Sequence, residues 1–363
     1  MKRWLGYTVS LVVTVVALEL ISALAMHAGW IPGSTPTYRL PRKEDSRFWV
    51  DLSVNFGVWH NSNTVYRHKS ACFDVLLESN SYGAVDRERS RSSDASRVVV
   101  LGDSFVEGFG VEEEFRFTNL LEAQTGREFL NFGTSGHFGP TQYWKLYESM
   151  ASKFDHDEVW IMLLPDNDFL DDYPRFQRYQ PYLEGEYPNY ELKYTLDSPL
   201  KSSNGPRQIG GWTYLREFSY FLNVLRYVKY ILSENSEETR GSEERPENYS
   251  GYSDYSEEEL MRLTYVLEQI KKISGGRKMR VFTLPRLNDF YAAREGKKMS
   301  LPQPMQRISG DVGFEFFDLF PGMDTTYQDQ WEQMFHECDG HWSEEGHRVA
   351  AEIMRMETEE SVQ

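Results

Sequence analysis

The stretch VVVLGDSFVEGFG, residues 98–110, decides the fold. It begins with a continuous apolar run, which is typical of a parallel strand buried on both faces. At Gly102 the run passes into a polar turn that opens a helix, so Ser104 would lie at the sheet edge where α/β folds bind ligands. Amides of such a turn can donate to an oxyanion. Ser104 is therefore a candidate nucleophile, with a simple helix cap as the alternative.

Four further apolar runs repeat this pattern and alternate with helical stretches. The five runs are 97–101, 128–132, 158–164, 278–284 and 314–319. The helical stretches are 117–124, 141–154, 256–273 and 343–355, and the third starts with a capping box from Ser256 to Glu259. Strands that alternate with helices predict a three-layer α/β domain with right-handed crossovers.

Three other polar segments follow an expected strand or precede an expected helix. Gly133 ends one strand, and its amide can approach a ligand closely. Asn167 follows another strand and offers a side-chain amide as a donor. Near the C-terminus, His341 can act as general base on Ser104, and Asp339 can hold the tautomer of its ring.

These segments together resemble a known superfamily. The motifs are GDSF at 102–105, NFG at 131–133, NDF at 167–169 and DGHW at 339–342. In this order they resemble the four blocks of the SGNH, or GDSL-type, hydrolases, over roughly residues 80–360. The resemblance implies a flavodoxin-like fold with a five-stranded parallel sheet.

The resemblance also implies roles for five residues. Ser104 would be the nucleophile and His341 the base, oriented by Asp339. The oxyanion hole would consist of the Ser104 amide, the Gly133 amide and the Asn167 side chain. One residue instead of the commoner two separates Asp339 from His341, a spacing that looks like the DHHW and alginate-acetylation branch. The block around Asn167 also lacks its usual preceding glycine, since an aspartate stands there.

The first thirty residues favour a membrane location. Residues 4–26 are apolar except for Glu19 and could span ~30 Å of hydrocarbon as a helix. We favour an uncleaved anchor over a signal peptide cleaved after an A-x-A site at 23–25, because the apolar stretch is long for a signal peptide. Lys2 and Arg3 indicate a cytoplasmic N-terminus, which places the domain outside the cytoplasm. Glu19 is expected to be a neutral carboxylic acid.

The chain divides into three expected regions. Residues 1–30 form the transmembrane anchor, 31–95 an irregular N-terminal extension, and 96–361 the hydrolase-like domain, with an insertion at about 169–255. Within the insertion we expect a hairpin at 173–196, an amphipathic helix at 214–232 and an acidic surface loop at 233–259. The helix could lie on the membrane, but packing on the domain is favoured.

Charge and cysteine content exclude other classes. With 39 Lys+Arg, 56 Asp+Glu and no long basic run, we expect no nucleic-acid partner. Two cysteines exclude a disulfide scaffold and a four-thiolate zinc site. Cys72 and Cys338 could form one bridge or remain buried thiols.

The remaining histidines carry no expected chemistry. His336, Cys338, Asp339 and His341 lack the spacing of a metal site, and we expect neither a metal nor a cofactor. We expect His347 at the surface or core edge, and His137 as a pocket-lining residue without a catalytic role.

The sequence thus suggests a membrane-anchored, extracytoplasmic serine esterase. It would remove or transfer an acyl group, with acetyl favoured, on a carbohydrate or lipid. Hydrolysis and transfer use the same residues, so the sequence does not separate them. The alternative is a non-catalytic glycan-binding or assembly component that retains the fold.

Overall fold

A five-stranded parallel sheet forms the centre of the molecule. The computed structural model describes residues 2–31, 35–36, 38–40, 48–172, 181–194, 211–229 and 249–360. The strands are β5 (Arg97–Gly102), β6 (Glu128–Gly133), β7 (Glu158–Leu163), β10 (Lys278–Thr283) and β11 (Glu315–Asp318). Their order is β11-β10-β7-β5-β6, and all neighbours are parallel. The expected α/β fold with this sheet is confirmed.

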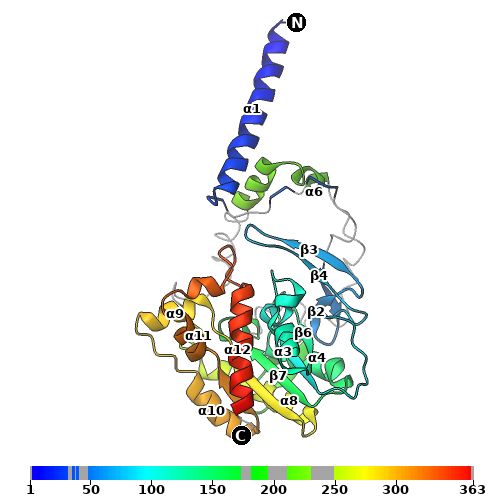
Figure 1. The fold of residues 1–363 in the computed structure, drawn as a ribbon, viewed down its shortest axis with the longest axis vertical. Coiled ribbons are helices and arrows are strands. Elements are labelled where there is room, and N and C mark those ends of the chain that lie inside the picture. The colour runs from blue at the N-terminus through cyan, green and yellow to red at the C-terminus, as the bar shows by residue number, and fades with distance from the viewer. Residues whose placement is uncertain are drawn as a thin grey trace.

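Helices cover both faces of the sheet. Alternate residues of β5 serve two separate cores: Val98 and Val100 pack in one, Val99 and Leu101 in the other. The first core contains side chains of α3 (Phe117–Thr125) and α12 (Glu344–Glu360). The second contains side chains of α4 (Pro140–Ser149), α8 (Glu257–Ser274) and α10 (Pro302–Val312). The three expected layers are visible in Figure 1.

The strand order reverses beside β5, so the loops that follow β5 and β7 open on the same crevice. Each loop leads into a short helix, α2 (Ser104–Glu107) or α5 (Pro165–Asp171). Helices α9 (Leu287–Arg294) and α11 (Phe320–Tyr327), which we had not expected, follow β10 and β11. The expected capping box of α8 is present: Glu259 N donates to Ser256 Oγ at 3.2 Å.

The N-terminal extension is more regular than expected. It contains two antiparallel hairpins, β1 (Trp49–Ser53) with β2 (Gly57–His60) and β3 (Val65–Lys69) with β4 (Asp74–Glu78). Two strands alone rarely bury enough apolar surface to be stable. Here Phe48 joins side chains of β4 in a small third core that includes Phe109 of the main domain.

Helix α1 (Lys2–His27) projects from one end of the molecule, opposite the C-terminal end of α12 (Figure 1). Its segment Gly6–His27 is long and apolar enough to cross a membrane, and little of it is buried. The expected long apolar N-terminal helix is therefore present.

The described part of the insertion contains a hairpin and two short helices. Strands β8 (Pro181–Glu184) and β9 (Glu191–Tyr194) pair antiparallel within the expected hairpin. The helix expected at 214–232 is divided into α6 (Gly211–Arg216) and a second helix that covers 220–229. The division has a local cause, because Ser219 Oγ accepts from Leu222 N at 3.1 Å and so caps the second helix. Most of the expected acidic loop, 233–248, lies outside the described residues.

Candidate active site

Ser104 is held at the end of the central strand by its neighbours. All residues of β5 are buried. Gly102 packs so closely against Val106 that a Cβ added to Gly102 would lie 2.2 Å from the Val106 side chain. Asp103 caps α2, since its Oδ1 accepts from Phe105 N at 2.9 Å. Ser104 is the first residue of the helix, and only 8% of it is exposed. The cap and the packing fix its position.

His341 lies on a closed loop that precedes α12. The loop is pinned by a β-bridge between Phe335 and Trp342, and His336 N donates to His341 O at 2.7 Å. Gly340 has a φ of +74°, a conformation that favours glycine. The loop turns back sharply at Gly340 and presents His341 toward α2.

The structure brings Ser104, His341 and Asp339 together. His341 Nε2 lies 2.8 Å from Ser104 Oγ, and His341 Nδ1 lies 3.3 Å from Asp339 Oδ1. Burial raises the pKa of Asp339, but its hydrogen bonds and charge interaction with His341 outweigh that effect, so the pKa lies below its usual value. An ionised Asp339 favours a proton on Nδ1 and leaves Nε2 free to accept the proton of Ser104.

Aromatic side chains hold the imidazole in this orientation. The ring of Phe109 stacks on that of His341 with centroids 4.1 Å apart, and the ring of Phe105 lies 5.2 Å away. Both phenylalanines follow Ser104 in the same segment. The nucleophile and the plane of its partner are therefore positioned by one stretch of chain.

Asn167 lies in the first turn of α5 and contacts Asp103, the residue before Ser104. Its Nδ2 donates to Asp103 Oδ2 at 3.1 Å. Burial raises the pKa of Asp103 to about 6, against hydrogen bonds from Phe105 N and Asn167 that lower it. An amide group carries two hydrogens, so the second one can serve an oxyanion. Asn167 is thus anchored to the residue that precedes Ser104, and its role as an oxyanion donor stays a prediction.

The amide of Gly133, an expected oxyanion donor, is engaged by a neighbouring side chain in this structure. Its amide donates to Asn131 Oδ1 at 2.9 Å. A Cβ on Gly133 would lie 2.3 Å from Glu107 N, so this glycine allows β6 to pack closely against α2. The motif therefore also has a structural explanation, and the role of Gly133 in an oxyanion hole stays a prediction.

A buried network that we had not expected supports this loop. His60 Nε2 lies 2.6 Å from Glu107 Oε1, and His60 Nδ1 lies 2.8 Å from the carbonyl oxygen of Gly83. Burial raises the pKa of Glu107, but its hydrogen bond and charge interaction with His60 and its other hydrogen bonds outweigh that effect, so the pKa lies below its usual value. Glu107 also accepts from Trp49 Nε1 at 2.6 Å and from the Ser135 hydroxyl.

The network joins three segments around the nucleophile. Glu107 ends α2, Ser135 follows β6, and Trp49 and His60 belong to the N-terminal hairpin β1–β2. Both side chains of the His60–Glu107 pair are fully buried. Sequence reasoning missed it because the partners are 47 residues apart and form no local motif.

We predict that Glu107→Ala destabilises the protein by about 3–5 kcal/mol, because it leaves the buried polar groups of His60, Trp49 and Ser135 without their shared acceptor. The matched control is Glu359→Ala, which removes an exposed pair with Arg355 at 2.8 Å and should cost at most about 1 kcal/mol. Urea denaturation in detergent measures both. Equal losses would contradict the structural role of the buried Glu107 network.

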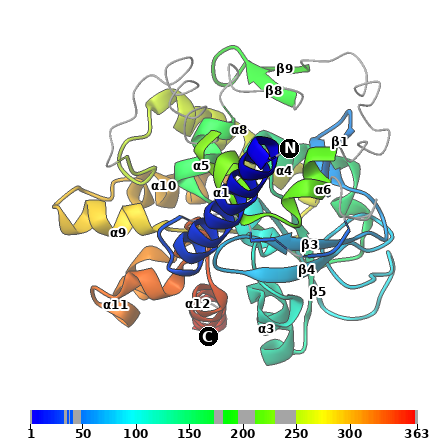
Figure 2. The same ribbon diagram turned by 90° about the horizontal axis from the view of Figure 1, so that it is seen from above.

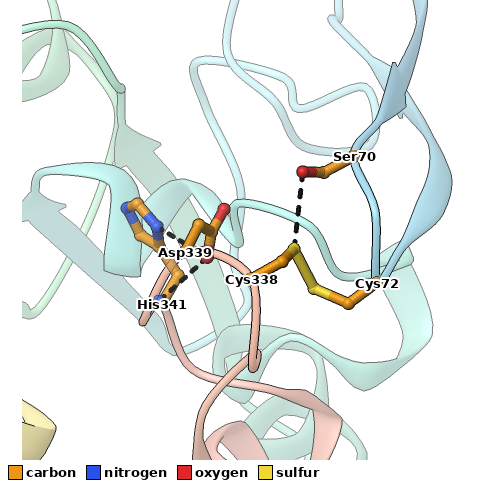
Figure 3. Close-up of a disulfide and its surroundings, with 5 residues drawn as sticks. All are labelled: Ser70, Cys72, Cys338, Asp339 and His341. Carbon is orange, nitrogen blue, oxygen red and sulfur yellow. Dashed lines mark hydrogen bonds and ion pairs between the residues drawn. A yellow bond between two sulfur atoms is a disulfide. The ribbon is translucent and has the colours of Figure 1, made fainter. Parts of the chain in front are cut away.

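A disulfide connects the N-terminal extension to the catalytic loop. Cys72, in the turn between β3 and β4, is bonded to Cys338, which is 266 residues away in sequence. Figure 3 shows that Cys338 directly precedes Asp339, with His341 on the same loop. Of the two alternatives for the cysteines, the bridge is the one that the structure contains. It holds the Asp339 segment against the β3–β4 turn.

We predict that the double variant Cys72→Ser/Cys338→Ser loses about 2–5 kcal/mol of unfolding free energy, as is usual for removal of a native disulfide. Denaturation with and without dithiothreitol measures the loss. The reductant should destabilise the unaltered protein by a similar amount and leave the double variant unchanged. A stable double variant would contradict the tethering role.

The other histidines lie apart from the catalytic contact. His347 is in the core, not at the surface or core edge as expected: it is fully buried, and Phe117 N donates to its Nδ1 at 3.3 Å. Burial lowers its pKa to about 3, so it remains neutral. His137 is exposed and lies 3.1 Å from Asp171 Oδ1. Among the described residues, no group of His, Cys, Asp and Glu is arranged to hold a metal ion.

No protein-family model matches the chain, and no curated protein matches it. Among solved structures, a lipolytic protein of the G-D-S-L family from Veillonella parvula is 11% identical, with a TM-score of 0.39, and the match covers 71% of this chain and 95% of that one. A lipase/acylhydrolase from Enterococcus faecalis is also 11% identical, with a TM-score of 0.40 and coverage of 72% and 94%. An alpha/beta hydrolase from the metagenome of Lake Arreo is 13% identical, with a TM-score of 0.35 and coverage of 72% and 94%. Similarity at this level carries no conclusion about the chemistry of this chain.

Proposed function

We propose that this chain is a membrane-anchored, extracytoplasmic serine esterase of the SGNH type. It removes or transfers an acyl group, most simply acetyl, on a carbohydrate or lipid. The observation that carries the proposal is the distance of 2.8 Å between Ser104 Oγ and His341 Nε2, with Asp339 on the other ring nitrogen. A serine, a base and an orienting carboxylate in this arrangement suit acyl transfer.

The reaction would proceed through an acyl-enzyme. Ser104 Oγ attacks the ester carbonyl while its proton passes to His341 Nε2. The Ser104 amide and Asn167 Nδ2 donate to the oxyanion. His341 then protonates the leaving alkoxide, and an ester on Ser104 remains. Water, or an acceptor hydroxyl, gives its proton to His341 and attacks this ester, which restores Ser104.

Two features support an extracytoplasmic membrane location. Disulfides persist mainly in oxidising compartments, and Cys72–Cys338 joins distant parts of the domain. The segment Gly6–His27 suits an anchor, with Lys2 and Arg3 on its cytoplasmic side. In this proposal residues 1–30 anchor a catalytic domain at 96–361, which carries the insertion at about 169–255.

We predict that a fluorophosphonate probe modifies Ser104, because His341 activates its hydroxyl for attack on phosphorus with loss of fluoride. Peptide mass spectrometry locates the adduct, and Ser104→Ala is the blank. A folded protein that takes up no probe, or takes it up equally in the Ser104→Ala variant, would favour the non-catalytic glycan-binding alternative.

We predict that Asn167→Ala lowers kcat for an aryl acetate by roughly 10²–10³ with little change in KM, as expected for loss of one oxyanion donor. Because Asn167 also contacts Asp103, circular dichroism and thermal melting must show an intact fold. A loss of activity below about threefold would remove Asn167 from the oxyanion hole.

Release of acetate from acetylated polysaccharides, with and without added acceptor, would distinguish hydrolysis from transfer.

A further inference from the structure

Glu19, the one charged residue within the apolar segment of α1, has partners in the insertion. Its Oε2 accepts from Tyr220 N at 2.9 Å, and its Oε1 accepts from the Ser219 hydroxyl. Tyr220 begins the helix at 220–229, so the side chain of Glu19 accepts from the first backbone N–H of that helix. We had expected a neutral carboxylic acid at this position and had named no partner for it. The structure shows a helix cap supplied from the membrane segment.

The contact extends along one face of α1. Ser22 and Met26 are buried, and they follow Glu19 at intervals of three and four residues, which places all three on one helix face. His27 Nε2 lies 3.0 Å from the Tyr220 hydroxyl. Leu24, on another face, remains exposed. The helices of 211–229 lie beside this end of α1 in both views (Figure 1 and Figure 2).

The helix pair carries apolar side chains that the protein leaves uncovered. They are Trp212, Leu215, Phe218, Leu225 and Val228, with exposed fractions between 44% and 71%. Soluble surfaces rarely gather apolar side chains so closely, and such patches mark contacts with proteins or membranes. Our expectation that this segment packs on the domain is therefore not met.

Position and charge favour a bilayer as the covering partner. Glu19 precedes His27 by eight residues, so the contact lies about 12 Å inside the end of the apolar helix. Interfacial helices insert their apolar face about 5–10 Å below the headgroups. The exposed Arg226 and Lys229 are suited to anionic headgroups. Trp212 is of the residue type enriched at membrane interfaces.

We propose that the helix pair at 211–229 is a membrane-docking element that inserts its apolar side chains into the outer leaflet and is held to α1 by Glu19. The proposal rests on the membrane anchoring in the proposed function. A single spanning helix allows the domain to tilt and rotate on its linker. A second lipid contact fixed to the same helix restricts that freedom and holds the catalytic domain in one orientation.

Depth-dependent quenching in proteoliposomes tests the proposal. Single cysteines at Leu215, Leu225, Leu11 and Met356 receive an NBD label without reductant, so that the native disulfide stays closed. Leu11→Cys reports the inserted part of α1. Met356→Cys is the control, because Met356 is as exposed as Leu225, at 49% against 47%, but lies on α12 at the opposite end of the molecule.

The full chain is reconstituted in phosphatidylcholine and phosphatidylglycerol that carry nitroxide acyl chains. We expect labels at 215 and 225 to be quenched at least about threefold more than the label at 356, as an interfacial depth requires. If the label at position 11 is quenched while the labels at 215 and 225 behave like the label at 356, the docking proposal is contradicted. The proposed membrane anchor is then still supported. If the label at position 11 is not quenched either, the proposed membrane anchor is contradicted as well.

A second measurement tests the part played by Glu19. Glu19→Leu removes the acceptor and should lower quenching at 225, whereas Glu19→Gln keeps an acceptor oxygen and should preserve it. Equal quenching in both variants would contradict attachment through Glu19.

A second copy of the chain is the alternative partner for the apolar patch. In that case the labels at 215 and 225 would escape lipid quenching but report an apolar environment, and this environment would be lost when the protein is diluted in lipid. That result would overturn the proposal.

Discussion

The hydrogen bond between Ser104 Oγ and His341 Nε2 is the interaction on which the site depends. It joins residues 237 positions apart, one in the turn after β5 and the other in the loop before α12. The strand β5 delivers Ser104 to the sheet edge, while the turn at Gly340 returns His341 to the same place. Chemistry at Ser104 requires both loops to be rigid, because proton transfer needs hydrogen-bond distance.

Rigidity comes from outside the sheet. The N-terminal extension supplies Trp49 and His60 to the buried Glu107 network, and its β3–β4 turn supplies Cys72 to the disulfide beside Asp339. An extension that is separate in sequence thus supports both the loop of the nucleophile and the loop of the base. Phe109 belongs to both arrangements, since its ring packs on His341 and in the small core of the extension.

Sequence reasoning succeeded where the signal is local. The five strands of the sheet are continuous apolar runs, and the cap of α8 is a four-residue pattern, so both were predictable. It failed where tertiary partners decide. The contact between His60 and Glu107 joins residues 47 positions apart, and no local motif specifies it. Glu19 was recognised as unusual, yet its partner at Tyr220 lies 201 residues away and depends on how the insertion folds.

The central claim is that His341 activates Ser104. The most direct measurement is the rate of fluorophosphonate labelling in His341→Ala, compared with the unaltered protein and with His347→Ala, in proteins whose melting transitions are intact. If His341 is the base, His341→Ala is labelled at least about 10²-fold more slowly, whereas any folded His347→Ala protein keeps its rate. Labelling of His341→Ala at the rate of the unaltered protein would contradict the account.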